Sequence, residues 1–210
     1  MPDLFTDCEN AQDLAYKNIC SAEYAIEQQM KVFCESLWYK FEIHADTHFL
    51  TQIRRSFYER YWEMYLTSSL IDWGFEVRSS RHGPDILIEN NDLRIWIEAV
   101  ASGNGDPISN PDAVPDIETG AAQLVPEEKI ILRLRSSIEA KSLVYHNYIR
   151  DSIIESNEPF IIALNGAKLN FMSRTDDIPY ILKSILPIGD HYYDFQNETD
   201  GTAESTIEIE

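Results

Sequence analysis

The spacing of the apolar residues changes at about Gly74, and this change most constrains the fold. From residue 49 to residue 70, apolar side chains recur every three or four positions, which is the period of an amphipathic helix. After Gly74, residues 75–80, 84–89 and 93–101 alternate or run apolar with many β-branched side chains, which is typical of strands. The change predicts an α+β fold.

The segments before these strands are predicted to be helical. Residues 8–45 contain few helix breakers and carry apolar side chains three or four positions apart, which predicts one or two helices. Residues 48–72 predict one further helix, for which Asp46 or Thr47 would be the N-cap. Gly74 follows this helix, as expected of the residue that ends a helix in the left-handed conformation.

The segments after the strands are more varied. Residues 102–126 are rich in Gly, Pro, Asp and Asn, which predicts a long loop of the kind that is usually functional or mobile. Residues 127–155 predict a helix that Ser136 and Ser137 could break, and residues 159–166 predict a short buried strand. The tail predicts a partly helical segment at 176–189, a strand at 191–196, and an edge strand or a frayed end at 201–210.

These segments predict three parts of the chain. We expect a helical N-terminal extension at residues 1–45, a main domain at residues 46–195 and an acidic C-terminal tail at residues 196–210.

The chain is strongly acidic. Its 17 Lys and Arg residues against 36 Asp and Glu residues give a net charge of −19. Such a charge favours solubility and opposes non-specific attraction to nucleic acid. Any binding to nucleic acid must therefore depend on a local basic patch, or on metal ions that offset the acids.

The cysteines and the apolar segments bear on the compartment. Cys8, Cys20 and Cys34 cannot all pair and show no CxxC spacing, which favours reduced thiols in a cytoplasmic protein. The first residues are acidic and lack the apolar segment of a secretory signal. No window approaches 18 consecutive apolar residues, so no transmembrane helix is expected.

Three carboxylates, Glu63, Asp85 and Glu98, fall on the predicted helix and on two neighbouring predicted strands. Glu63 shares a helix face with Glu59, so both could simply face solvent, and Asp85 could be a turn residue after Gly83-Pro84. Glu98 interrupts an apolar strand, where a buried carboxylate needs a cation or a hydrogen-bond partner. Carboxylate oxygens are the ligands that Mg2+ prefers, so the three acids predict a divalent-metal site.

These residues resemble the motif of the PD-(D/E)xK, or restriction-endonuclease-like, nuclease superfamily. Glu63 matches its helix acid, Pro84-Asp85 its PD, and Glu98-Ala99-Val100 its (D/E)xK. The resemblance covers about residues 46–165 and implies the superfamily's core, a mixed central sheet flanked by helices. The helical residues 1–45 would be an N-terminal extension of this core. It also implies that Asp85, Glu98 and the carbonyl of Ala99 hold Mg2+ or Mn2+, with Glu63 as a direct or water-mediated ligand.

The chain departs from this motif at Val100, which stands where the superfamily usually has lysine. In the superfamily this basic residue is known to move to the following helix, and Lys141 is the best substitute here. Lys141, Tyr145 and Tyr148 fall on one stripe of the predicted helix, and Lys141 with Tyr145 is similar to the QxxxY motif of some members. The alternative is an exposed Lys141, or one that pairs with Glu139.

The resemblance implies metal-assisted hydrolysis of phosphodiester bonds, most simply in DNA, with Glu63, Asp85, Glu98 and Lys141 as catalytic residues. Lys141 would orient the attacking water or neutralise the transition state. One alternative is a catalytically inactive protein of the same fold that binds a protein partner, which Val100 and the net charge of −19 favour. Another is a hydrolase that acts on a substrate other than nucleic acid.

Basic residues near the expected site bear on substrate binding. Four arginines could contact phosphates, whereas a histidine between the first two predicted strands is expected to be structural or exposed rather than catalytic. The arginines are Arg78, Arg81, Arg133 and Arg135, and the histidine is His82.

Overall fold

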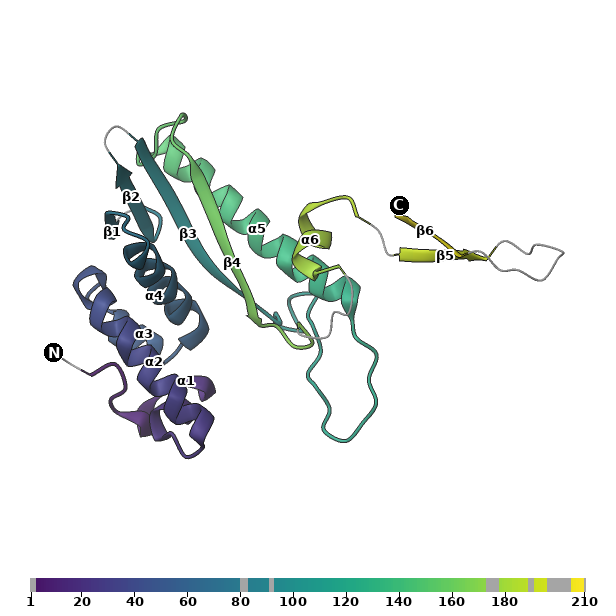
Figure 1. The fold of residues 1–210 in the computed structure, drawn as a ribbon, viewed down its shortest axis with the longest axis horizontal. Coiled ribbons are helices and arrows are strands. Elements are labelled where there is room, and N and C mark those ends of the chain that lie inside the picture. The colour runs from purple at the N-terminus through teal and green to yellow at the C-terminus, as the bar shows by residue number, and fades with distance from the viewer. Residues whose placement is uncertain are drawn as a thin grey trace. The chain divides into compact units, whose positions relative to one another are not determined.

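The computed structural model describes residues 3–79, 83–90, 93–172 and 178–188, together with the backbone of residues 191–195 and 205–209. These residues form an α+β fold, as predicted, in which a four-stranded sheet is flanked by helices (Figure 1). The chain divides into two compact units, one of residues 1–102 and 137–168 and the other of residues 103–136 and 169–210. The elements in chain order are η1 (Cys8–Asn10), α1 (Leu14–Ser21), α2 (Ala25–Phe41), η2 (Glu42–His44), α3 (Phe49–Ile53), α4 (Phe57–Asp72), β1 (Val77–Ser79), β2 (Ile86–Asn90), β3 (Leu93–Gly103), α5 (Glu127–Arg150), β4 (Phe160–Lys168), α6 (Tyr180–Ile185), β5 (His191–Phe195) and β6 (Ser205–Ile209).

The main sheet has the strand order β1-β2-β3-β4. β1 and β3 both run antiparallel to β2, and β4 runs parallel to β3 after the connection through α5 (Figure 1). Ile86 lies opposite Ile97, and Leu87 lies opposite Trp96. The strands predicted after Gly74 are therefore confirmed, although most of β4 is only half-buried rather than buried.

α4 and α5 cover opposite faces of this sheet. One face carries Ile86 against Leu70 of α4. The other face carries Trp96, against which Tyr148 of α5 packs. Because successive side chains of a strand point to opposite faces, Glu98 shares the face of Trp96 and is directed toward α5.

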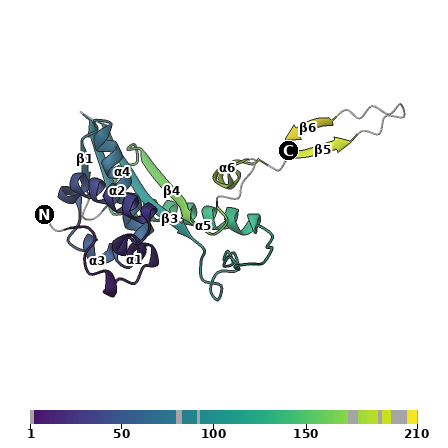
Figure 2. The same cartoon turned by 60° about the horizontal axis from the view of Figure 1, so that its bottom comes forward.

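The helices α1 to α4 enclose a separate aromatic core (Figure 1, Figure 2). Phe49 is fully buried there, with its ring centroid 5.4 Å from that of Trp38 and 4.7 Å from that of Phe41. Aromatic pairs at these separations add to the stability that burial alone supplies. The helices predicted within residues 8–45 are confirmed as α1 and α2.

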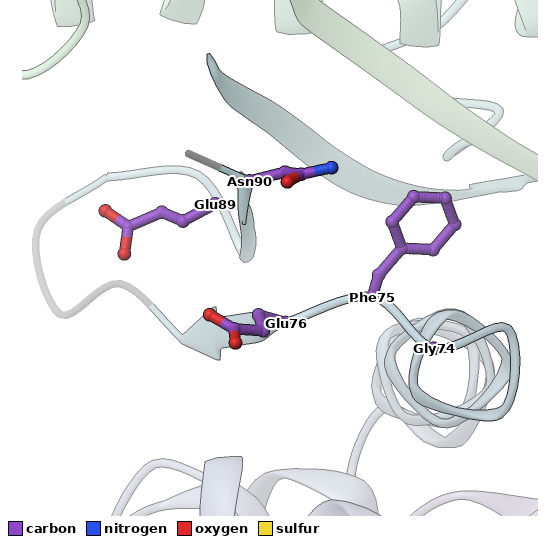
Figure 3. Close-up of a pocket in the computed structure, with 5 residues that line it drawn as sticks. All are labelled: Gly74, Phe75, Glu76, Glu89 and Asn90. Carbon is purple, nitrogen blue, oxygen red and sulfur yellow. The ribbon is translucent and has the colours of Figure 1, made fainter. Parts of the chain in front are cut away.

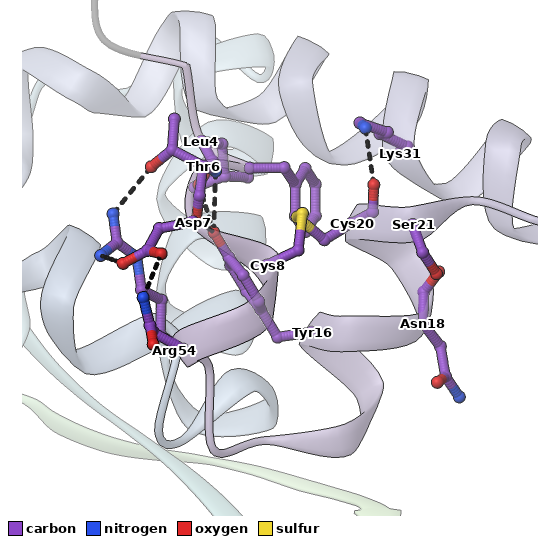
Figure 4. The surroundings of a disulfide bond; sticks show 12 residues. Leu4, Thr6, Asp7, Cys8, Tyr16, Asn18, Cys20, Ser21, Lys31 and Arg54 are labelled. Atoms are coloured by element: carbon purple, nitrogen blue, oxygen red, sulfur yellow. Dashed lines mark hydrogen bonds and ion pairs between the residues drawn. A yellow bond between two sulfur atoms is a disulfide. The ribbon is translucent and has the colours of Figure 1, made fainter.

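The prediction of three reduced cysteines is wrong for two of them. Cys8 and Cys20 form a disulfide that joins η1 to α1 (Figure 4). The hydroxyl of Tyr16 in α1 donates a hydrogen bond of 3.0 Å to the carbonyl oxygen of Leu4, in the segment before η1. This contact holds η1 against α1, so that the two sulfurs lie together. Cys34 is a free thiol, and burial raises its pKa to about 12. The cytoplasmic location stays a prediction and loses the support of reduced thiols, since disulfides persist mainly in oxidising compartments.

The prediction of a single helix at residues 48–72 is also wrong, because the chain forms α3 and α4 with a break between them. The carbonyl oxygen of Arg54 accepts hydrogen bonds of 2.9 Å from the backbone N–H groups of Gln12 and Asp13. The N–H of Phe57, the first residue of α4, donates to Oδ2 of Asp13 at 3.0 Å. These long-range bonds satisfy backbone groups that a continuous helix would have paired internally, so the break is stabilised by tertiary contacts.

Gly74 ends α4 as predicted. Its φ is +84°, and its N–H donates to the carbonyl oxygen of Ile71 at 2.9 Å. The N–H of Phe75 donates to the carbonyl oxygen of Leu70 at 3.1 Å, which completes a Schellman motif. The motif turns the chain from α4 directly into β1.

The later segments follow the predictions with one further correction. A long loop precedes α5, which runs through Ser136 and Ser137 without a break and ends at Arg150 rather than near residue 155. The hydroxyl of Ser136 donates to Asp112 at 3.2 Å, so it does not compete for the helix backbone. α6 and the β5–β6 pair confirm the predicted helical and extended parts of the tail, with β6 as an edge strand. The domain boundaries predicted at residues 45 and 195 stay predictions.

None of the described helices combines the length and the apolar character that a membrane span requires.

Candidate active site

Asp85 and Glu98 lie side by side, one directly before β2 and the other within β3. Ile86 pairs with Ile97, so the antiparallel register continued by one residue sets Asp85 opposite Glu98. The backbone N–H of Ala99 donates to Oδ2 of Asp85 at 2.8 Å, which fixes this carboxylate beside β3. The two acids that the sequence motif pairs are thus brought together, and Glu98 is buried.

Lys141 reaches Glu98 from α5. Its Nζ lies 2.6 Å from Oε1 of Glu98, and the two side chains are 28% and 6% exposed. Tyr148, two turns further along α5, directs its hydroxyl to Oε2 of Glu98 at 3.4 Å. Lys141 therefore brings a positive charge to the acids, whereas Val100 of β3 brings none. The partner of Lys141 is Glu98 rather than Glu139.

Glu63 comes from α4 and is paired with Arg60. NH1 of Arg60 lies 2.9 Å from Oε2 of Glu63, whose side chain is 10% exposed. Burial raises the pKa of Glu63 to about 8; the charge of Arg60 lowers it, while the charges of Asp85, Asp46 and Glu98 raise it further. Arg60 does not outweigh burial, because its guanidinium is shared with Asp46. Glu63 thus lies within the electrostatic influence of the other two acids.

Burial raises the pKa of all three acids. Burial raises the pKa of Asp85, against the lowering effects of the Ala99 N–H and the Lys141 charge. Burial and the charge of Asp85 raise the pKa of Glu98, and Lys141 lowers it. Burial and the charge of Glu98 raise the pKa of Tyr148 to about 12, so its hydroxyl keeps its proton at neutral pH. A further cation here would offset both the cost of burying charged carboxylates and the repulsion between them.

The chemistry of the donors fits a hard divalent cation, but the side chains are not arranged to hold one as they stand. Carboxylate oxygens are what Mg2+ and Mn2+ prefer, and Asp85, Glu98 and Glu63 supply them. Among the described residues, however, no group of three or more acidic, histidine or cysteine side chains is close enough to hold a metal ion. Lys141 is bonded to Oε1 of Glu98, so a metal that uses this oxygen requires a shift of Lys141. Arg60 contacts Oε2 of Glu63.

Two residues considered with this group lie elsewhere. Glu59 shares α4 with Glu63, but its Oε1 lies 2.7 Å from Nζ of Lys168, the last residue of β4. Tyr145 stacks on Phe160, with ring centroids 4.7 Å apart. The α5 tyrosine that contacts the acids is therefore Tyr148, and not the residue that the QxxxY-like spacing selects.

Two of the four arginines expected near phosphates, Arg78 and Arg133, are paired with acids. Arg78 is paired with Glu89 at 2.8 Å. Arg133 is paired with Asp112 at 3.4 Å, within the other compact unit. Arg81 and His82 lie outside the described residues.

Sequence reasoning missed Arg60. The signal was present, because Arg60 precedes Glu63 by three positions and residues at that spacing are neighbours on a helix. It carried little weight, since most such pairs lie in solvent. Only the burial of Glu63 gives the pair its significance.

A pocket of about 270 Å3 lies at the turn from α4 to β1 and the end of β2 (Figure 3). Its lining is Gly74, Phe75, Glu76, Glu89 and Asn90, so it contains none of the predicted site residues. The two glutamates make it unsuited to a phosphate.

Comparison of the chain with protein-family models, with curated proteins and with solved structures found no match. Function must therefore be argued from Asp85, Glu98, Lys141 and Glu63 themselves.

Proposed function

We propose that the chain is a metal-dependent nuclease that hydrolyses phosphodiester bonds, with DNA as the expected substrate. The observation that carries this proposal is the buried cluster in which Lys141 is bound to Glu98 beside Asp85. Metal-assisted hydrolysis needs acids that hold a cation and a group that acts on water or on the transition state. The order of the elements, with an acid on α4, the acids of β2 and β3, then α5 and a parallel β4, supports a restriction-endonuclease-like core.

Each residue has a role in this proposal. Asp85, Glu98 and the carbonyl of Ala99 would hold Mg2+ or Mn2+, with Glu63 as a direct or water-mediated ligand. The ion would supply a bound water of lowered pKa and stabilise charge on the phosphate. Lys141 would orient the attacking water or neutralise the charge that develops in the transition state. Tyr148 would hold Glu98 in place through its hydroxyl.

A cleavage assay tests the proposal. The protein is incubated with linear, circular and single-stranded DNA and with RNA, each in Mg2+, Mn2+ or EDTA. We expect cleavage with one of the metals, none with EDTA, and none by Asp85→Asn, which keeps the shape of the side chain and removes its charge. Binding should fall steeply with salt, because a net charge of −19 leaves only local contacts to phosphate. If no substrate is cut with either metal, the chain is not a nuclease.

A second candidate function is that of a nuclease-fold protein without catalysis, which binds a protein partner. The ion pair between Lys141 and Glu98 favours it, because it neutralises Glu98 without a metal. Val100 in the lysine position of the motif favours it as well. A ligand that binds only the folded state raises Tm by mass action. The candidate without catalysis therefore predicts no rise of Tm with millimolar Mn2+. The nuclease predicts a rise, which Asp85→Asn should abolish.

A further inference from the structure

We propose that Arg60 is a positioning residue, which fixes Glu63 toward the metal site and is itself anchored by Asp46 and Phe49. The inference rests on the proposed function, since it concerns how Glu63 is presented to the metal. It gives the segment before α4 a part in the site, which the sequence motif does not.

The guanidinium of Arg60 is held from three sides. NH1 contacts Oε2 of Glu63 at 2.9 Å, and NH2 donates to Oδ2 of Asp46. Its central carbon lies 4.7 Å from the centroid of the Phe49 ring, within the range of a cation–π contact. The Arg60 side chain is 16% exposed, so water competes little for these contacts.

The anchors of Arg60 are themselves fixed. Phe49 is fully buried and packs against Trp38 and Phe41 of α2. The carboxylate of Asp46 also accepts a hydrogen bond of 2.6 Å from the backbone N–H of His48. Arg60 is therefore oriented by the aromatic core of the N-terminal helices, and it transmits that orientation to Glu63.

Such an arrangement matters because Glu63 is on α4, whereas the contacts that fix the other two acids come from β3 and α5. The backbone N–H of Ala99 holds Asp85, and Lys141 with Tyr148 holds Glu98. Glu63 has a side chain as long and flexible as that of Glu98, and its contact with Arg60 restrains it. Residues that orient metal ligands in this way typically account for about 10- to 100-fold in metal affinity.

The test measures Mn2+ binding itself, by titration calorimetry and by the Mn2+ concentration at half-maximal rise of Tm. We expect Arg60→Gln to raise this midpoint concentration about tenfold. Arg60→Lys should lie between this variant and the wild type, because lysine keeps the charge but cannot engage two carboxylates with a planar fork. Asp46→Asn should give a smaller rise, and it decides the question if Arg60→Gln does not fold.

Arg54→Gln is the matched control. Like Arg60, Arg54 is a partly buried arginine, with a side chain that is 26% exposed, but it lies just before α4. It is paired with Asp7 at 3.4 Å and bonded to the hydroxyl of Thr6. Arg54 and Arg60 each have a buried Nε without a hydrogen-bond partner. The two variants should lower the metal-free Tm comparably, but Arg54→Gln should leave the Mn2+ midpoint unchanged.

The outcomes separate this inference from the proposed function. If the wild type shows no Mn2+-dependent rise of Tm, the metal site fails and this inference fails with it. If the wild type responds and Asp85→Asn does not, but Arg60→Gln binds Mn2+ as tightly as Arg54→Gln or more tightly, the metal site stands. Arg60 is then only a counter-charge, and the positioning role is overturned.

Discussion

Two Glu–Lys contacts of nearly equal length lie in very different surroundings. Lys141 and Glu98 are 2.6 Å apart, and Lys168 and Glu59 are 2.7 Å apart. The Glu98 side chain is 6% exposed and has Asp85 as a neighbour, whereas Glu59 and Lys168 are 37% and 39% exposed. Distance therefore does not distinguish a candidate catalytic pair from an ordinary surface pair. Burial and the surrounding charge do so, because an exposed pair is screened by water and contributes little.

The largest expected difference between the two pairs is in cleavage rate. Lys141→Ala should lower the turnover of the metal-loaded protein at least roughly a hundredfold, with substrate affinity almost unchanged, because a group acting on the transition state affects turnover more than binding. Lys168→Ala should cleave like the wild type. Val100→Lys combined with Lys141→Ala should recover part of the rate. Equal rates for Lys141→Ala and the wild type would remove Lys141 from the mechanism.

The next difference concerns pH. Burial raises the pKa of Glu63 to about 8, so between its ordinary pKa and about 8 the folded protein binds a proton that the unfolded chain releases. Glu63 therefore favours folding most below its ordinary pKa, and this contribution is lost as pH rises to about 8. The unfolding free energy of the wild type should therefore fall between pH 5 and pH 8. In Glu63→Gln this fall should be smaller by about 2–4 kcal/mol, as measured by urea unfolding at each pH. Glu59→Gln, at the Lys168 pair, should keep the wild-type slope; if both variants keep it, the burial of Glu63 has no energetic consequence.

Removal of each lysine should also separate the pairs in stability. Lys141→Met leaves the buried Glu98 without its cation and should cost about 1–3 kcal/mol in unfolding free energy at pH 7. Lys168→Met should cost about 0–1 kcal/mol, as for other exposed pairs. Glu98→Gln added to Lys141→Met should restore much of the loss, since the unpaired charge is then gone. A similar cost for both lysines would mean that the Glu98 pair is as well hydrated as the surface pair.

The smallest effect is that of salt on the exposed pair. The contribution of Lys168 and Glu59, obtained from a double-mutant cycle, should be a few tenths of a kcal/mol at low salt and vanish at 1 M NaCl, where the screening length is about 3 Å. The same cycle on Lys141 and Glu98 should keep most of its value. Equal sensitivity to salt would place both pairs in solvent.

Much of the site could be predicted because its signals are local. Glu98 interrupts an apolar strand, and that alone predicts a buried acid with a partner. The helical spacing that selects Lys141 and Tyr148 as one stripe follows from 3.6 residues per turn. The pairing of β2 with β3 joins two apolar runs that are neighbours in the sequence, at residues 84–89 and 93–101.

The parts that could not be predicted depend on contacts between distant segments. The break before α4 is stabilised by Gln12 and Asp13, more than 40 residues earlier in the chain. The disulfide of Cys8 and Cys20 requires a packed N-terminal segment, and no spacing rule indicates it. Arg60 gains importance from its contacts with Asp46 and Phe49 and from the burial of Glu63. Local propensity gives way to tertiary hydrogen bonds and packing at each of these places.

The bonds of Asp13 have a consequence for the rotational phase of α4. One oxygen of Asp13 caps α1 through the N–H of Tyr16, and the other caps α4 through the N–H of Phe57. A start of α4 displaced by one residue would rotate the positions of its side chains by about 100° around the axis. Glu63 would then turn away from the sheet, although no residue near it had changed. Asp13 thus fixes the residue at which α4 begins and the direction in which its side chains point. An insertion or deletion at residues 54–56 should therefore disorient Glu63 more than a substitution there.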